Sequence, residues 1–129
     1  MQKRIKLLLE RNSYFIALLI TAVITYLSLG RPVQFKPPIE INFLDKILHA
    51  SAYFVLSLSW LFVFRLHSIK KGYIIFVFLF GVLMELLQGW LTENRQSDVF
   101  DVLANSFGII IAILLFEYIY KYYQIYFEK

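Results

Sequence analysis

Polar residues interrupt a strongly apolar chain between Glu85 and Gly108, where the sequence reads E-L-L-Q-G-W-L-T-E-N-R-Q-S-D-V-F-D-V-L-A-N-S-F-G. Apolar sequence long enough to cross a bilayer runs into this stretch from both sides. Hydrocarbon offers polar groups no hydrogen bonds, so ionisable residues inside a membrane indicate a functional site whose partners have to be found. The stretch therefore predicts where the protein acts more clearly than which reaction or ligand it serves.

The composition is typical of a membrane-embedded protein. Of the 129 residues, 60% are hydrophobic, whereas roughly half are apolar in a soluble domain. The net charge of +4 comes from short terminal and loop clusters. This pattern indicates membrane topology and contact with anionic lipid, and it does not favour nucleic-acid binding. The chain has no cysteine, which excludes disulfides and cysteine-ligated zinc, and we expect one domain over residues 1–129 without a cofactor.

Four apolar segments predict an all-α bundle of four membrane-spanning helices. They cover residues 14–30, 43–64, 72–91 and 101–120. The third has twenty residues, which as a helix measures roughly 30 Å and matches the hydrocarbon thickness. A basic region precedes the first segment, as in a signal peptide, but no small-x-small cleavage site follows Leu29, so we expect the first helix to be retained.

The distribution of Lys and Arg predicts that both termini lie in the cytoplasm. Nine of the 13 lie before the first helix, in the loop after the second or in the C-terminal tail. The other four, Arg31, Lys36, Lys46 and Arg95, lie at the opposite end. By the positive-inside rule, that opposite end is extracytoplasmic. The start of the second helix, the end of the third and the start of the fourth then bring their polar residues to one depth at the outer face.

Two of the predicted helices carry polar residues at helical spacing. Asp45, His49 and Tyr53 on the second helix are spaced i, i+4, i+8 and share one face. Glu85 and Gln88 on the third are spaced i, i+3. We expect these faces to point into the bundle, where the polar groups find partners.

The fourth helix carries a polar stripe that continues in small residues. Asp101, Asn105, Gly108 and Ala112 form the stripe, and Asp98 lies one turn before it. Small residues let a neighbouring helix approach closely, so the stripe should also face the interior. An N-cap role explains one of the two aspartates. Three inward faces at a common depth predict a shared pocket.

Several of these residues have a structural interpretation beside a functional one. Glu85 either belongs to the site or forms an ion pair with Lys46 or Arg95 that sets the helix packing. Gln88 either contacts a ligand or bridges two helices. Lys46 either snorkels to the interface or joins Arg95 in binding an anion.

His49 has three interpretations: a hydrogen-bonded packing residue, a proton-transfer group or a metal ligand. A divalent ion would need further ligands, and His, Glu and Asp could supply them in principle. No H-E-x-x-H spacing is present, and His67 falls in the loop at the opposite end. We therefore predict no metal site.

The sequence resembles the VanZ-like family of small bacterial membrane proteins in three motifs. These are D-K-x-x-H-x-x-x-Y from Asp45 to Tyr53, E-x-x-Q at Glu85 and Gln88, and R-x-x-D-x-x-D-x-x-x-N-x-x-G from Arg95 to Gly108. The resemblance covers about residues 43–115. It departs at Ala112, where the family often has a second glycine.

The resemblance implies an integral protein of the bacterial cytoplasmic (inner) membrane that acts in the cell envelope at the outer face. The family is named for a protein associated with resistance to the glycopeptide antibiotic teicoplanin, so a link to antibiotic resistance is implied as well. The positions that match its motifs are Asp45, Lys46, His49, Tyr53, Glu85, Gln88, Arg95, Asp98, Asp101 and Asn105.

Two hypotheses from different classes follow. The first is lipid binding: the pocket binds or modulates a lipid head group or a lipid-linked cell-wall precursor through Asp45, Lys46, Tyr53, Gln88, Arg95, Asp98 and Asn105. The alternative is an intramembrane acid–base enzyme in which His49, Glu85 and Asp101 act as acid and base on a lipid-linked anionic substrate. We prefer the first because no nucleophile is evident. Membrane lipids are the expected partners in both hypotheses, and the sequence does not predict an oligomeric state.

Overall fold

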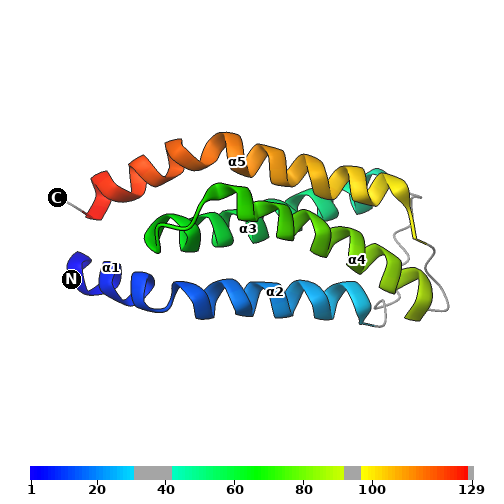
Figure 1. The fold of residues 1–129 in the computed structure, drawn as a ribbon, viewed down its shortest axis with the longest axis horizontal. Helices are drawn as coiled ribbons and strands as arrows, with labels where there is room; N and C mark the ends of the chain where they lie inside the picture. Colours follow the sequence, from blue (N-terminus) through cyan, green and yellow to red (C-terminus); the bar gives the residue numbers. More distant parts are fainter. Residues whose placement is uncertain (31–41, 92–96, 128–129) are drawn as a thin grey trace.

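The computed structural model describes residues 1–30, 42–91 and 97–127, and all of its regular structure is helical. The elements are α1 (Gln2–Arg11), α2 (Ser13–Leu29), α3 (Asn42–Leu66), the short 3-10 helix η1 (Lys71–Ile74), α4 (Ile75–Leu91) and α5 (Val99–Phe127). The long helices run side by side, and the described ends of the chain lie at the same end of the molecule as η1 (Figure 1). The all-α prediction is confirmed.

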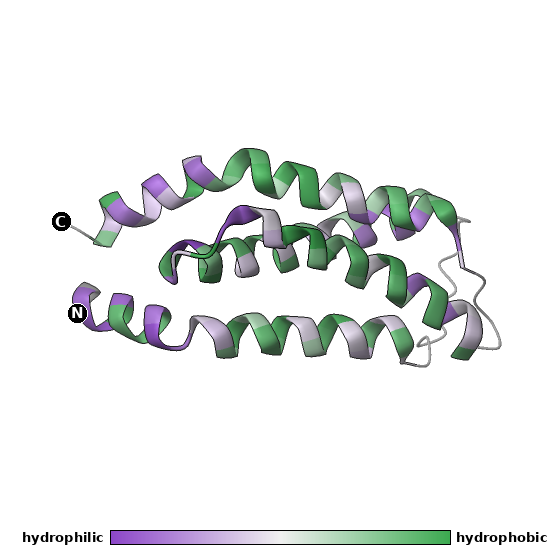
Figure 2. Ribbon diagram, in the orientation of Figure 1, coloured by the Kyte–Doolittle hydropathy of each residue, from purple (hydrophilic) through white to green (hydrophobic). Residues whose placement is uncertain are grey.

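Three helical segments are long and apolar enough to cross a membrane, so the chain is a membrane protein. They are residues Phe43–Leu66, Lys71–Leu91 and Val99–Phe127. Two of them exceed the predicted bounds: α3 extends to Leu66, and α5 starts at Val99 and continues to Phe127. Figure 2 shows apolar residues along the middle of the helices and polar residues gathered toward both ends of the molecule.

The first predicted helix, residues 14–30, corresponds to α2, but a second helix that was not predicted, α1, precedes it. Residues 3–11 and 13–29 form two helical segments that meet at a 60° bend, and the two together are long and apolar enough for a fourth membrane span. Ser13 marks the bend, where its hydroxyl donates to the carbonyl oxygen of Glu10 at 3.0 Å. Because α1 carries Lys3, Arg4 and Lys6 beside exposed leucines, it has the composition of a helix that lies in a membrane interface.

The closest helix packing joins α3 to α5. A Cβ atom on Gly108 would come within 2.9 Å of the carbonyl carbon of Ala50 and within 3.0 Å of the backbone nitrogen of Phe54. Ala112, one turn further along α5, is completely buried. The small-residue stripe thus faces a neighbouring helix as predicted, because only small side chains permit this approach. The contact aligns Asp101 and Asn105 with the first turns of α3.

Two apolar clusters fill the interior below the polar residues. One contains Ala17, Leu61, Val63, Phe64, Ala112 and Phe116, and the other contains Ile24, Tyr53, Leu56, Val77 and Ile109. Large apolar side chains also cover the outside, including Phe15, Phe107 and Leu114. Such a surface would promote aggregation in water, whereas in a bilayer it faces lipid tails of the same polarity.

Candidate functional site

The polar residues of three helices meet at one end of the bundle. Asp45, Lys46 and His49 come from the first turns of α3, and Glu85 comes from the last turns of α4. Asp98, Asp101 and Asn105 come from the start of α5 and the residue before it. We call these seven residues the polar cluster. Helical spacing places the residues of each helix on one face, and the close α3–α5 contact brings the faces together.

His49 lies at the centre of the polar cluster. Its Nδ1 atom lies 3.0 Å from Oδ1 of Asn105 and 3.5 Å from Oε1 of Glu85. The Asn105 oxygen can only accept, so this contact is a hydrogen bond in the tautomer whose proton is on Nδ1. The Nε2 atom faces two carboxylates, at 3.7 Å from Oδ2 of Asp101 and 4.0 Å from Oδ1 of Asp45. An imidazole held in this way can take up a proton at Nε2 and share the resulting charge with carboxylates on both sides.

Lys46 is bound by carboxylates of the polar cluster. Its ammonium donates to Oδ2 of Asp98 at 2.5 Å and to Oδ1 of Asp101, and Asp45 lies 3.8 Å away. The hydrogen bond from Lys46 lowers the pKa of Asp98 below its ordinary value. Lys46 therefore does not present a free positive charge to an anion. The other cation of the predicted anion site, Arg95, lies outside the described residues.

Asp98 and Asp101 have different roles, and the sequence indicated only that one of the two would cap the helix. Oδ1 of Asp98 accepts a hydrogen bond from the backbone N–H of Phe100 at 2.8 Å, which is the N-cap contact of α5. Asp101 is buried and uses its two oxygens on different partners, Lys46 and His49. One aspartate thus caps the helix and the other orders the polar cluster.

Glu85 is buried in the polar cluster, with 3% of its surface exposed. Among the described residues its nearest basic side chain is His49, whose Nδ1 lies 3.5 Å from Oε1, and no ion pair joins Glu85 to Lys46. Of the two ion pairs considered for Glu85, the one with Lys46 is not formed, because the lysine reaches toward α5 instead, and Arg95 lies outside the described residues. The second oxygen of Glu85 has no hydrogen-bond partner within the part of the chain that the structure describes. Glu85 therefore keeps one buried acceptor that no described protein group satisfies.

Tyr53 and Gln88 lie at the edge of the polar cluster, where both line a cavity and also take part in the helix packing. The Tyr53 ring covers Gly81 of α4, where an added Cβ would come within 2.9 Å of its Cε1 atom. Tyr53 is buried in the apolar core, and its hydroxyl finds no partner among the described residues. Gln88 donates to the carbonyl oxygen of Ser28 at 3.0 Å and so joins α4 to α2. This contact is the helix-bridging role that the sequence analysis considered for Gln88.

A cavity of 690 Å³ opens beside the polar cluster, between α2 and α3. Asp45, His49 and Gln88 form its polar end together with Ser28. Its apolar wall comes from both helices: Leu19, Ile20, Val23, Ile24, Leu27, Leu48, Ala52 and Val55. The volume falls within the range of about 300–1,000 Å³ that ligand sites have. The sequence analysis missed Ser28 and the whole contribution of α2, because nothing in an apolar helix indicates which neighbour it will face.

Three residues of the polar cluster can also hold a metal ion. Asp45, His49 and Asp101 each offer one ligand atom, and these atoms lie within 4.8 Å of one another. Carboxylate oxygens with one imidazole nitrogen suit a divalent ion of the zinc or manganese type. The hydrogen bond from Nδ1 of His49 to Asn105 leaves Nε2 free for this purpose, as in many metal sites. The sequence analysis considered a metal only as the third interpretation of His49.

Comparisons with known proteins place the whole bundle in one family. A protein from Schizosaccharomyces pombe, described as uncharacterized protein C11E3.10, is 32% identical over 96 residues, which is 71% of this chain. The chain spans 58% of that relative's length. No solved structure matches the chain. The protein family described as VanZ/LLP1 matches residues 4–120, which include every residue of the polar cluster, and the chain therefore belongs to the VanZ/LLP1 family.

Proposed function

We propose that the protein binds the head group of a membrane lipid, or of a lipid-linked cell-wall precursor, in the cavity between α2 and α3. The observation that carries this proposal is the composition of the cavity wall. A polar end formed by Asp45, His49 and Gln88 continues directly into an apolar wall from α2 and α3. This arrangement matches an amphipathic molecule whose head group meets the polar cluster while its chain follows the apolar helices.

We also propose that the polar cluster faces the outside of the cytoplasmic membrane. The helix ends that carry it lie opposite the two termini and η1 (Figure 1). Nine of the 13 Lys and Arg residues of the sequence belong to the end with the termini. The positive-inside rule supports a cytoplasmic location for that end. The ligand would then enter from the outer leaflet, where envelope lipids and wall precursors are exposed.

The groups that line the cavity favour a head group with hydrogen-bond donors. Asp45 is an acceptor and has about half of its side chain exposed, whereas Lys46 is already bound by Asp98 and Asp101. An ammonium or hydroxyl group would pair with Asp45 directly. The relative in a yeast supports a lipid common to bacteria and yeasts over a bacterial wall precursor. The link to teicoplanin resistance that the family resemblance implies is a separate part of the proposal, and the drug susceptibility of a bacterium that expresses the chain tests it.

Lipid binding in nanodiscs tests the proposal. The probes are phosphatidylethanolamine, whose ammonium donates hydrogen bonds, and phosphatidylcholine, whose methylated nitrogen does not. We expect the wild type to retain phosphatidylethanolamine preferentially in native mass spectrometry. The preference for phosphatidylethanolamine should disappear in Asp45→Asn, which removes the acceptor charge, and in Ala52→Phe, which fills part of the cavity. It should persist in the control Glu117→Gln, which lies at the other end of the bundle. Equal retention of the two lipids by all four proteins would reject the head-group site.

An intramembrane acid–base enzyme is the second candidate. It is supported by the imidazole of His49, which has Glu85 at 3.5 Å on one side and Asp101 at 3.7 Å on the other. His49 would take a proton at Nε2 from a substrate hydroxyl or a water molecule, and the two carboxylates would stabilise the imidazolium. Lipid profiles of cells that express wild type or His49→Gln distinguish the candidates. If the protein is an enzyme, cells that express His49→Gln should lack a lipid product that cells with the wild type contain, although the variant still binds lipid. A binding protein would give the same lipid profile in both.

A further inference from the structure

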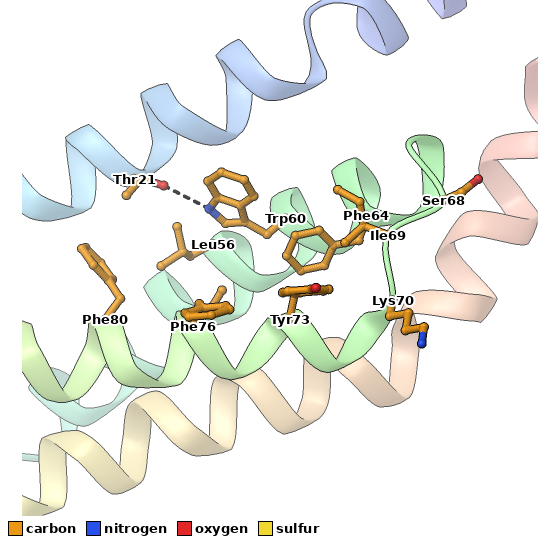
Figure 3. A pocket seen from close by; sticks show the side chains of 11 residues that line it. Thr21, Leu56, Trp60, Phe64, Ser68, Ile69, Lys70, Tyr73, Phe76 and Phe80 are labelled. Carbon is orange, nitrogen blue, oxygen red and sulfur yellow. Dashed lines mark hydrogen bonds between the residues drawn. The ribbon is translucent and has the colours of Figure 1, made fainter.

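A second cavity of 740 Å³ lies at the end of the bundle opposite the polar cluster, between α2 on one side and η1 with α4 on the other (Figure 3). Its wall is mostly aromatic and aliphatic: Leu56, Trp60, Phe64, Ile69, Tyr73, Phe76, Val77 and Phe80. The Trp60 indole donates to the Thr21 hydroxyl at 3.2 Å, and this bond holds the ring against α2 (Figure 3). We call this cavity the aromatic groove. Its volume is sufficient for a hydrocarbon chain, and it extends from the turn at Lys70 into the apolar middle of the helices at Leu56 and Phe80.

The aromatic groove continues into a basic pocket at the turn between α3 and η1. A cavity of 370 Å³ shares Phe64, Ser68 and Ile69 with the groove and is completed by Leu61, Arg65 and Lys71. Lys70 lies at the mouth of the aromatic groove (Figure 3). Three cations therefore surround the place where the two cavities meet.

The cations at this turn are only partly neutralised. Glu117 of α5 pairs with Lys71 and lies 3.9 Å from Arg65. Among the described residues no carboxylate lies within ion-pair distance of Lys70, which is exposed. The basic residues of α1 lie at this same end of the bundle (Figure 1). The turn thus presents a net positive charge directly above an apolar groove, which complements an anionic lipid in both parts.

We infer that the aromatic groove and the basic turn form a binding site for an anionic phospholipid. One acyl chain lies along Trp60, Phe76 and Phe80, and the phosphate is bound by Lys70. The site lies at the other end of the bundle from the polar cluster, so it does not depend on the proposed function. A lipid bound at this site would anchor the end of the bundle that carries the termini in its membrane leaflet. Basic segments near a membrane attract anionic lipids in the same way.

Trp60 makes the site measurable, because brominated acyl chains quench a tryptophan that they touch. The sequence has two tryptophans, and Trp90 is 89% exposed on α4, so Trp90→Phe leaves Trp60 as the single reporter. This variant is reconstituted in phosphatidylcholine vesicles that contain rising fractions of dibrominated phosphatidylglycerol or dibrominated phosphatidylcholine. We expect phosphatidylglycerol to bind about fivefold more tightly, the effect expected of one cation at a membrane surface.

Two charge-matched variants in the same background decide whether the preference belongs to this site. In Lys70→Gln the ratio of the affinities for phosphatidylglycerol and phosphatidylcholine should fall close to one. Lys121→Gln removes an exposed lysine outside both cavities and should leave this ratio unchanged. Both lysines are exposed, so neither change disturbs the core. Equal quenching by the two lipids in the reporter protein would overturn the inference. An equal loss of preference in the two lysine variants would overturn it too, because it would show a general effect of surface charge.

Discussion

Gly108 of α5 lies directly against the backbone of Ala50 in α3. A Cβ atom at Gly108 would come within 2.9 Å of the Ala50 carbonyl carbon, a distance that real side chains essentially never show. The obstacle is backbone inside a helix, which cannot rotate away as a side chain can. The contact lies two turns below Asp101, so it determines how closely the two halves of the polar cluster approach each other.

Gly108→Ala should therefore destabilise the bundle although it adds only a methyl group. We expect a loss of at least about 1–3 kcal/mol in the free energy of unfolding, since overpacking forces the helices apart. Gly72→Ala is the matched control, because a Cβ there meets nothing within 4 Å. Unfolding in detergent, followed by circular dichroism, measures both. Equal stabilities of the two variants would show that α3 and α5 do not touch at Gly108.

Lys46 and Asp101 should be energetically coupled. Lys46→Gln leaves the buried Asp101 without its cation, which we expect to cost about 2–3 kcal/mol, somewhat less than the ~3–5 kcal/mol of a fully buried pair. The double variant with Asp101→Asn should be more stable than the sum of the single effects predicts. The pair of Lys71 and Glu117, both about half exposed, is the comparison, and its coupling should be about 0–1 kcal/mol. A coupling as small for Lys46 and Asp101 would contradict the geometry of the polar cluster.

Asp98 should contribute to stability in a pH-dependent way. The hydrogen bond from Lys46 lowers its pKa in the folded protein, so its contribution is complete above the ordinary aspartate pKa of about 4 and is lost as the pH falls through the lower, folded value. Asp98→Asn keeps the cap on Phe100 but removes the charge. The wild type should therefore melt above Asp98→Asn at pH 6, and the difference should vanish in acid. A difference in melting temperature that does not change with pH would show that the charge of Asp98 beside Lys46 is not its cause.

Cysteine labelling tests the orientation on which the proposed function depends. The chain has no cysteine of its own, so a single introduced cysteine gives a clean signal. Ser97 and Ser68 are both exposed and belong to opposite ends of the bundle. A membrane-impermeant thiol reagent should label Ser97→Cys in intact cells and Ser68→Cys only after lysis. The opposite pattern would place the polar cluster in the cytoplasm and end the cell-envelope hypothesis.

Local spacing was sufficient to predict the helices and the faces that carry the polar cluster. The period of an α-helix places Asp45 and His49 on one face of α3, whatever that helix packs against. The small residues Gly108 and Ala112 indicated in the same way which side of α5 meets a neighbour. These features depend only on residues a few positions apart, so the sequence alone contains them. Asn12 and Ser13, residue types that favour helix ends, mark the bend, and the sequence analysis did not use this signal.

The partners of the polar side chains were decided by the tertiary structure. Lys46 could have reached Glu85 by its position in the sequence, but the close approach of α5 brings Asp98 and Asp101 nearer. The wall that α2 adds to the cavity beside Asp45 likewise follows from the packing of distant segments, through contacts such as that of Gln88 with Ser28. The sequence by itself determined which polar residues face the bundle interior and not the lipid, and at which end of the helices they lie. Which of them touch depends on how closely whole helices approach, and that distance is set by side chains far apart in the chain.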